Sequence, residues 1–248
     1  MTLKSLDLLG YPVFIEKVDQ IPFNEKITIN TLNAHSYRIA KKDLLFSKAL
    51  KSSDILLPDG ISIAHGINIF YKKVKIRKIA GYDAFLYLLN VLNGNHENCF
   101  FLGSTETTLN LLKEKVASNY PNIKIATFSP PYKAEFSRED NDLMINSINK
   151  VNPKVLFIGM TAPKQEKWGY IHRDELSAQI VCSIGAVFDF YAGTVKRPNK
   201  IIIKLNLEWL GRLVKEPRRM WRRYLLSTPI YFVDLYLSVL RGILRPKR

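Results

Sequence analysis

The sequence predicts an α/β protein with a Rossmann-like, mostly parallel sheet, helices on both faces of that sheet, and a basic helical appendage at the C-terminus. Three apolar segments indicate the sheet, because each ends in a glycine from which a helix can start: 98–102 before Gly103, 155–158 before Gly159 and 179–184 before Gly185. Continuous apolar runs of this length are typical of strands buried on both faces of a parallel sheet. The concentration of Lys and Arg after residue 195 indicates the appendage.

Ligands of open parallel sheets bind outside the carboxyl ends of the strands, so the three glycine turns predict one crevice at that edge. The turn after Gly159 continues with Pro163, which suits the first turn of a helix, and then with Lys164, Gln165 and Glu166. A helix N-terminus binds anions and nucleotides, and the Gln165 amide can pair with a nucleobase or a sugar. An ordinary turn between a strand and a helix is the alternative. None of the three turns has the spacing G-x-G-x-x-G, which argues against a dehydrogenase.

A further strand is expected at 26–30, and polar residues follow it. Thr31 and Asn33 either cap the next helix, which is expected to run to about Leu50, or contact a substrate; the sequence leaves both interpretations open. His35 is expected on a face of that helix rather than in a catalytic role.

Two acidic residues stand at turns where a carboxylate has either a structural or a chemical use. Asp59 follows a short strand at 54–57 and precedes a glycine, so it is an ordinary turn residue or a general base that accepts a proton from a hydroxyl group. Asp189 lies in an apolar, glycine-bounded loop at 185–193, where it is either satisfied by the backbone or a ligand for sugar hydroxyls.

The remaining expected elements are an edge strand and loop within 3–23, helices at 84–92, 104–119 and 137–151, and a strand at 123–128. Asp83 fits as a cap of the first of these helices, and the hydroxyls of Ser104 and Thr105 as caps of the second. Asp140 and Asp142 match the D-x-D metal motif of many glycosyltransferases. They lie on the first turn of a helix, where acids favour the helix dipole, so we predict a structural role and no metal site.

Composition restricts the class of protein. The chain has 248 residues, of which 47% are hydrophobic, and this excludes a disordered chain. Cys99 and Cys182 fall in expected strands and are interpreted as core residues of a protein in a reducing compartment. Residues 1–10 lack the pattern of a signal peptide.

The net charge of +15 is uneven, because residues 196–248 hold 14 Lys and Arg against 3 Asp and Glu. We therefore divide the chain into an α/β core, 1–195, and a basic appendage, 196–248, with an anionic partner. If helical phase carries across Pro217, Arg212, Arg219 and Arg222 share one face, and clustered guanidinium groups suit the oxygens of a diphosphate.

The terminal segment, 225–248, combines an apolar run with cations at its end. A transmembrane helix needs about 20 apolar residues, and this run is shorter and is interrupted by Pro229 and Asp234. We predict a segment that lies on an anionic membrane surface. A C-terminal helix docked on the core is the alternative.

Taken in order, the motifs resemble the WecG/TagA/CpsF family, glycosyltransferase family 26, over roughly residues 5–225. The motifs are Thr31-x-Asn33, Pro58-Asp59-Gly60, Arg77 with Gly81-x-Asp83, Phe101-Leu102-Gly103, Gly159 with Pro163-Lys164-Gln165-Glu166, Gly185-x-x-Phe188-Asp189 with Gly193, Arg197-Pro198, Glu208-Trp209-x-x-Arg212 and Glu216-Pro217-x-Arg219. Many members have Thr-Pro-Asn-Pro-Glu where this chain has Thr31-Leu32-Asn33-Ala34-His35, and many have an Ala between Arg197 and Pro198. These differences favour the exopolysaccharide branch over the teichoic-acid branch.

The resemblance implies an inverting, metal-independent enzyme at the cytoplasmic face of the plasma membrane, with no cofactor. It would transfer N-acetylmannosamine, glucose or a related sugar from a UDP-sugar to an acceptor linked to polyprenyl diphosphate. Asp59 would be the general base, with Thr31 near the reacting sugar. The expected substrate-binding residues are Asn33, Arg77, Gly81, Asp83, Gly103, Ser104, Gly159, Gln165, Glu166, Gly185, Asp189, Arg212, Arg219 and Arg222. The arginines up to about residue 224 would complete the site, and 225–248 would contact the membrane.

The competing hypothesis is a non-enzymatic nucleic-acid-binding protein with an α/β core. It explains the basic tail but neither the apolar run at 231–240 nor the turn from Pro163 to Glu166. We therefore expect no nucleic-acid partner.

Overall fold

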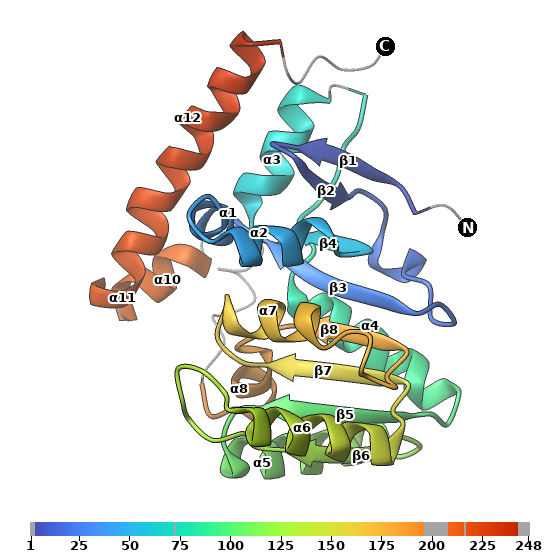
Figure 1. The fold of residues 1–248 in the computed structure, drawn as a ribbon. Coiled ribbons are helices and arrows are strands. Elements are labelled where there is room, and N and C mark those ends of the chain that lie inside the picture. Colours follow the sequence, from blue (N-terminus) through green and yellow to red (C-terminus); the bar gives the residue numbers. More distant parts are fainter. Residues whose placement is uncertain (1–2, 72, 196–207, 216, 243–248) are drawn as a thin grey trace.

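The apolar segments of the sequence form the strands of one eight-stranded sheet in a computed structural model that describes residues 3–71, 73–195, 208–215 and 217–242 (Figure 1). The strands are β1 (Ser5–Leu8), β2 (Tyr11–Phe14), β3 (Ile27–Leu32), β4 (Ile55–Pro58), β5 (Asn98–Gly103), β6 (Lys124–Phe128), β7 (Val155–Gly159) and β8 (Ile180–Ser183). Their order is β1-β2-β4-β3-β8-β7-β5-β6, and every neighbouring pair is parallel except the antiparallel hairpin of β1 and β2. The predicted α/β fold class is confirmed.

Helices cover both faces of the sheet. The helices of the core are α1 (Ala34–Ala40), α2 (Leu44–Lys51), α3 (Ile61–Phe70), α4 (Gly81–Gly94), α5 (Glu106–Asn119), α6 (Arg138–Val151), α7 (Lys164–Ile171) and α8 (Val187–Ala192), with a 3-10 turn η1 (Val18–Gln20). Those of the appendage are α10 (Glu208–Lys215), α11 (Pro217–Trp221) and α12 (Ser227–Leu240), with a π-helical turn η2 (Arg222–Leu226) between the last two.

Three details of the expected secondary structure are wrong. The helix expected up to Leu50 is two helices, because the Asp43 side chain accepts from the Phe46 N–H and starts α2 anew. Helix α3 was not expected. The segment 185–193, expected as a loop, contains α8. Of the two residues whose hydroxyls are expected to cap α5, Thr105 does so, since its hydroxyl accepts from Thr108 N–H.

Aromatic and aliphatic side chains fill the space on each face of the sheet. On one face Phe85 of α4 packs edge-on against Phe157 of β7 at 5.0 Å between ring centroids, and Phe188 of α8 packs in the same way against Phe101 of β5 at 5.4 Å. On the other face Trp168 of α7 belongs to a second buried cluster. Along β5, β7 and β8, successive residues belong alternately to these two clusters, as expected for strands buried on both faces.

The central strands β3 and β8 are neighbours, but the chain leaves them towards opposite faces. Helices α1 and α2 follow β3, and α2 packs beside α7, whereas α8, which follows β8, packs beside α5. A reversal of this kind opens a crevice at the carboxyl ends of the two strands. The reversal therefore lies at the edge of the sheet where the sequence predicts a crevice.

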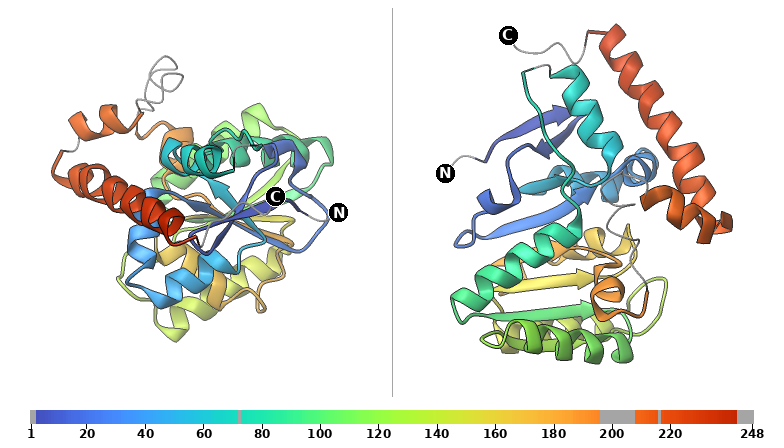
Figure 2. Two further views of the ribbon diagram at one scale, coloured as in Figure 1. Left: turned by 90° about the horizontal axis from the view of Figure 1, so that it is seen from above. Right: turned by 180° about the vertical axis from the view of Figure 1, so that it is seen from behind.

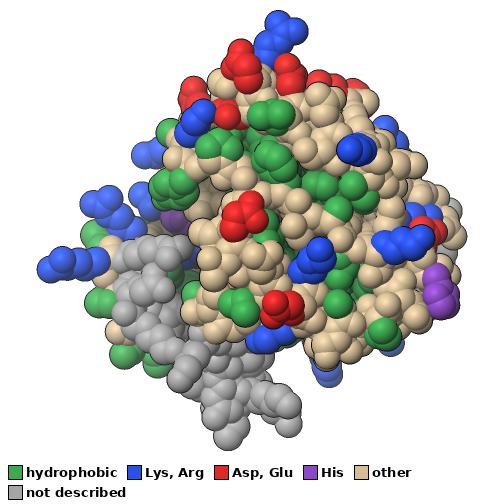
Figure 3. Space-filling model, turned by 90° about the horizontal axis from the view of Figure 1, so that it is seen from below, with side chains coloured by type: hydrophobic (Ala, Val, Ile, Leu, Met, Phe, Trp, Pro, Cys, Tyr) green, Lys and Arg blue, Asp and Glu red, His purple; other side chains and the backbone are tan. Residues whose placement is uncertain are grey.

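The appendage helix α12 is docked on the core beside α1 and α3, at the end of the sheet that β1 and β2 form (Figures 1 and 2). Tyr231 and Leu235 are fully buried there, and a Cβ on Gly66 of α3 would overlap the Tyr231 hydroxyl. Among the described residues no helix is both long and apolar enough to cross a bilayer. At the β6 end of the sheet, charged side chains of both signs are interspersed with apolar ones (Figure 3).

Candidate active site

The carboxyl ends of β3 and β4 form a corner that brings Asp59 next to Asn33. The Asp59 N–H donates to the carbonyl oxygens of Leu32 and Leu57, each at 2.9 Å, so the turn after β4 is tied to the last residue of β3. Gly60 follows with a φ of +98°, and its Cα faces the Asn33 side chain, because a Cβ built there would lie 3.9 Å from the Asn33 Cβ. This corner is the first part of the predicted crevice.

Asn33 has the capping role that the sequence left open. Its Oδ1 accepts from the N–H groups of His35 and Ser36, both at 3.0 Å, and its own N–H donates to the Ser36 hydroxyl at 2.8 Å. Thr31 lies two residues earlier on β3, opposite Leu57 of β4, and is half-buried. Asn33 is thereby fixed in place, and this fixes the end of the strand that carries Thr31.

Arg77 lies at the side of this corner. The segment that carries it is tied to β4 by the Ile79 N–H, which donates to Pro58 O at 3.0 Å. Arg77 is exposed and lines a groove of about 430 Å³ beside the start of α3. The other lining residues are Ile61, Ala64, His65, Asn68, Ile76 and Lys78.

The turns after β5 and β7 come into direct backbone contact. Gly103 has a φ of +118°, and a Cβ at this position would lie 2.6 Å from the Gly159 carbonyl oxygen. A Cβ on Gly159 would in turn overlap the Phe188 ring. Glycine is therefore required at both positions by space, and these residues bring two turns of the crevice together.

Ser104 and Asp189 are in contact at the carboxyl edge of the sheet. The Ser104 hydroxyl donates to Asp189 Oδ1 at 3.5 Å, and the Thr194 hydroxyl approaches the same oxygen at 3.5 Å. Asp189 is half-buried on the first turn of α8. The structure thus brings together two predicted residues that are far apart in the sequence.

Gln165 and Glu166 are buried behind the turns rather than directed outward. The Gln165 Oε1 accepts from Met160 N–H at 3.2 Å and from Gly185 N–H at 3.0 Å, and its Nε2 donates to Glu166 Oε1 at 2.8 Å. Glu166 is fully buried, which raises its pKa to about 7, and its Oε2 has no hydrogen-bond partner among the residues that the structure describes. The Gln165 amide joins the turns after β7 and β8, so its present contacts are structural.

Gly81 and Asp83 shape the start of α4. Gly81 is buried against Ile184, which follows β8, with 3.4 Å between a built Cβ and the Ile184 Cγ2. Asp83 Oδ2 accepts from Ala80 N–H at 2.9 Å, which is the capping role that the sequence indicates.

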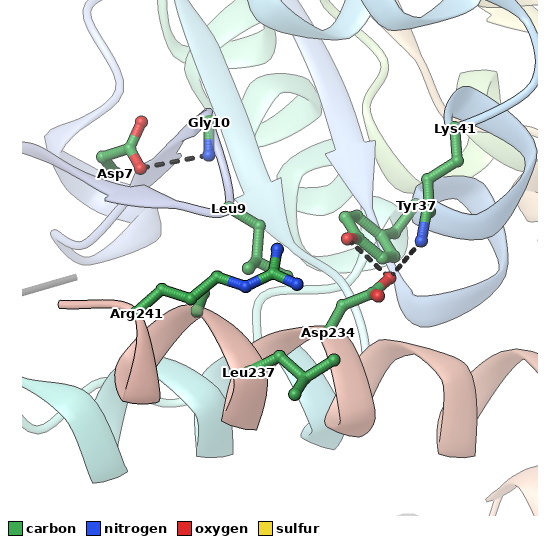
Figure 4. A pocket seen from close by; sticks show the side chains of 9 residues that line it. Asp7, Leu9, Gly10, Tyr37, Lys41, Asp234, Leu237 and Arg241 are labelled. Atoms are coloured by element: carbon green, nitrogen blue, oxygen red, sulfur yellow. Dashed lines mark hydrogen bonds and ion pairs between the residues drawn. The ribbon is translucent and has the colours of Figure 1, made fainter. Parts of the chain in front are cut away.

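The appendage helix α12 contacts helix α1, which starts at this corner. Asp234 of α12 accepts from the Tyr37 hydroxyl at 2.9 Å and from Lys41 Nζ at 2.6 Å (Figure 4). These residues line a cavity of about 350 Å³, across which Arg241 extends from the end of α12. Helix α12 is docked on the core, as the alternative for this segment expects, while a membrane contact of 225–248 stays a prediction. Neither of these two contacts of Asp234 was visible in the sequence.

Comparison with known proteins identifies the family. The model of the glycosyl transferase WecG/TagA/CpsF family matches residues 4–245. The chain belongs to the WecG/TagA/CpsF family. The resemblance inferred from the ordered motifs is therefore confirmed.

Relatives in this family carry the name N-acetylglucosaminyldiphosphoundecaprenol N-acetyl-β-D-mannosaminyltransferase. The chain is 34% identical to the one from Bacillus subtilis (strain 168) over 88% of this chain and 83% of the relative. It is 31% identical to the one from Bacillus spizizenii, and 25% identical to one from Staphylococcus aureus (strain MW2), in both cases over 84% of this chain and 78% of the relative.

For this WecG/TagA/CpsF protein, the appendage arginines are described only in part. Arg212 lies in α10 and Arg219 in α11, but their side chains are outside the described part of the structure, as are Arg197 and Pro198. Arg222 begins η2, and its side chain is exposed with the guanidinium carbon 5.4 Å from the Trp221 ring centroid. The predicted shared face of the three arginines stays a prediction.

The D-x-D acids of this family member take part in the structure of α6. Asp140 accepts from Lys133 Nζ at 2.8 Å and from Ser137 N–H at 2.9 Å, and these contacts hold the pKa of its carboxyl below the usual range. Asp142 lies on the exposed side of the same helix, where its Oδ2 is 3.9 Å from the Nε of Arg138. The structural role expected for Asp140 is confirmed.

Proposed function

We propose that the protein transfers N-acetylmannosamine, or a closely related sugar, from a UDP-sugar to N-acetylglucosamine linked to polyprenyl diphosphate. The proposal includes inversion at the anomeric carbon and independence from metal ions. The observation that carries it is 34% identity, over 88% of this chain, to an enzyme named for this transfer. The corner formed by Asp59, Asn33 and Thr31 supplies residues suited to the chemistry.

Asp59 is the proposed general base. A hydroxyl of the acceptor sugar forms a bond to the anomeric carbon of the donor, while the bond from that carbon to the UDP oxygen breaks. The hydroxyl proton passes to the Asp59 carboxylate, and UDP leaves with the bonding electrons. A single displacement of this kind inverts the anomeric centre. The fixed turn after β4 supports the role, because a base must lie within hydrogen-bond reach of the proton that it removes.

The negative charge that develops on UDP needs compensation. Helices α5 and α7 both begin at the carboxyl edge of the sheet, where their N-termini favour phosphate groups. Arg222 at the start of η2, together with Arg212 and Arg219, is proposed to contact diphosphate oxygens, since planar guanidinium groups bind them in pairs of hydrogen bonds. Preorganised donors can stabilise a leaving group without a metal ion.

The proposed location is the cytoplasmic face of the plasma membrane, where UDP-sugars and polyprenyl-linked acceptors meet. Helix α12 supports it, because it has a second apolar face that points away from the core, with Val233, Tyr236 and Leu240 exposed. These residues recur at helical spacing and form one stripe. The basic residues of 196–248 add attraction to anionic lipids.

Release of UDP tests the proposal. The purified chain is incubated with an N-acetylglucosaminyl diphosphate carrying a short prenyl chain and, in separate reactions, with UDP-N-acetylmannosamine, UDP-N-acetylglucosamine or UDP-glucose. We expect UDP release that depends on the acceptor and is fastest with UDP-N-acetylmannosamine, together with a disaccharide product of inverted configuration. Release that does not depend on the acceptor, or no release with any donor, contradicts the proposal.

A further inference from the structure

A short series of hydrogen bonds connects the appendage to the corner that holds Asp59. His35 Nδ1 of α1 lies 3.1 Å from the Ser227 hydroxyl of α12, and that hydroxyl donates to the backbone carbonyl of Arg222, also at 3.1 Å. Ser227 is fully buried. The Arg222 carbonyl is thus held by a side chain that itself contacts the core.

The Ser227 hydroxyl determines which group donates in each hydrogen bond of this series. A serine hydroxyl has one proton, and Ser227 gives it to the Arg222 carbonyl, so its oxygen can only accept from His35. This assigns the imidazole proton to Nδ1 and makes His35 the donor. The ring is neutral at neutral pH, because burial, and after it the charges of Arg223 and Arg38, lower the pKa of His35 to about 4.

His35 is itself positioned by the corner at the carboxyl ends of β3 and β4. Its backbone N–H donates to Asn33 Oδ1 at 3.0 Å. Asn33 follows Leu32, whose carbonyl accepts the Asp59 N–H at 2.9 Å. The position of the imidazole is therefore tied to the same strand ends that fix the proposed base.

Arg222 begins the π-helical turn η2, in which the chain passes from α11 into α12. Turns of this type are rare and occur frequently at functional sites. The anchored carbonyl belongs to the residue whose guanidinium is proposed to contact diphosphate.

We propose that His35 is a positioning residue, which holds the backbone of Arg222 through Ser227 at a fixed place relative to Asn33 and Asp59. The proposal rests on the proposed function only for the task of Arg222. The hold of His35 on η2 stands on the hydrogen bonds alone, and the two parts have separate tests.

Amide hydrogen exchange tests the hold without any substrate. His35→Leu and Ser227→Ala each remove one contact of the series, whereas His35→Asn keeps a donor near the place of Nδ1. Peptides covering 219–228 should exchange at least about 10-fold faster in the first two variants, which corresponds to about 1.4 kcal/mol of lost local stability. In His35→Asn the exchange should stay near that of the wild-type protein. Unchanged exchange in His35→Leu and Ser227→Ala overturns the proposal.

Steady-state transfer tests the positioning role. His35→Leu should lower kcat/KM by about 10–100-fold, mostly through KM for the diphosphate-bearing substrates, and His35→Asn should restore most of it. In an Arg222→Ala background the same substitution should cost less than about threefold, because residues that act through one another are not additive. Equal losses in both backgrounds, or faster exchange with unchanged transfer, overturn the role.

Lys41→Met is the matched control, because it removes an ion pair of 2.6 Å with Asp234 at the same α1–α12 contact but away from the series. It should leave the exchange of 219–228 and kcat/KM unchanged. A wild-type protein that releases no UDP contradicts the proposed function, while the exchange experiment still decides whether His35 holds η2.

Discussion

The Nε2 atom of Gln165 donates to Oε1 of Glu166 at 2.8 Å, and this contact determines which way the Gln165 amide faces. With Nε2 directed at Glu166, the amide oxygen faces the Met160 and Gly185 N–H groups and holds two turns of the crevice together. Glu166 thus supports the turns after β7 and β8 indirectly, because it holds the Gln165 amide in the orientation that accepts from both of them.

Glu166 should make stability depend on pH. Burial raises its pKa from 4.5 to about 7. Between these two pH values the folded protein keeps a proton on Glu166 that the unfolded chain releases. The stabilisation is complete below pH 4.5 and is lost as the pH rises through 7. In Glu166→Gln, which stays neutral and can still accept from Gln165, this loss should be absent. Between pH 4.5 and 8 the two free energies of unfolding should diverge by roughly 3 kcal/mol, measured by urea denaturation. Parallel curves contradict the prediction.

Gly103→Ala should destabilise the fold strongly. The substitution combines a φ of +118° with a Cβ that lies 2.6 Å from the Gly159 carbonyl oxygen, and backbone cannot move aside as a side chain can. We expect a loss of at least about 2 kcal/mol in the free energy of unfolding. Gly94→Ala at the end of α4 is the control, since a Cβ there has no neighbour within 4 Å in the described part of the chain, and it should be neutral or stabilising by less than about 1 kcal/mol. A Gly103→Ala protein as stable as its control contradicts this account.

The central sheet was predictable because its strands are continuous apolar runs with glycine at their ends. The glycine-ended β8, β7 and β5 are adjacent in the sheet, so one crevice follows from three local patterns. Helix α3 was not predictable in the same way, because Ile61, Ile63 and Ile67 are β-branched and the segment has no polar cap at its start.

The site was predictable where a residue's role depends on its own turn, as for Asn33, Asp83 and Asp140. It was not predictable where the role depends on a distant partner. Nothing in the spacing of Gly66 and Tyr231 indicates that one fits against the other, and the same is true of His35 and Ser227. Gln165 belongs to this second group, because its amide oxygen accepts from the N–H of Gly185, which is 20 residues away in the sequence.

Asp59→Asn should abolish most transfer and leave the fold intact. The amide is close in shape to the carboxylate, and the backbone contacts of residue 59 to Leu32 and Leu57 do not involve the side chain. Loss of a general base typically lowers the rate by ~10²–10⁴-fold. UDP release is the measurement, with UDP affinity by calorimetry and the melting temperature as controls. Near-normal turnover removes Asp59 from the mechanism.

EDTA should leave transfer unchanged. Asp140 is held by Lys133 and Ser137 as part of the start of α6, so the D-x-D pair is engaged in the structure of that helix. The measurement is UDP release before and after chelation, followed by addition of Mn²⁺ or Mg²⁺. Activity that falls with EDTA and returns with either ion shows that the motif, or another group of ligands, has a role in the reaction.

The outward face of α12 should carry the membrane affinity of the appendage. Deleting 225–248 cannot isolate this face, because Tyr231 and Leu235 belong to the core. Replacing Val233, Tyr236 and Leu240 with Gln removes three side chains that are 56%, 63% and 64% exposed and leaves the buried face intact.

This triple variant should bind anionic vesicles on the order of 100-fold more weakly, because immersion of three such side chains stabilises the bound state by a few kcal/mol. High salt should weaken the remaining binding, since the basic residues still attract the lipids. The control replaces Leu44, Leu143 and Ile171, which are 79%, 59% and 55% exposed on other helices, and should bind as the unmodified protein does. Both proteins should retain UDP release on the short-chain acceptor, because neither set of residues lies at the crevice. Equal co-sedimentation of the two variants with vesicles means that the apolar face of α12 is not the membrane contact.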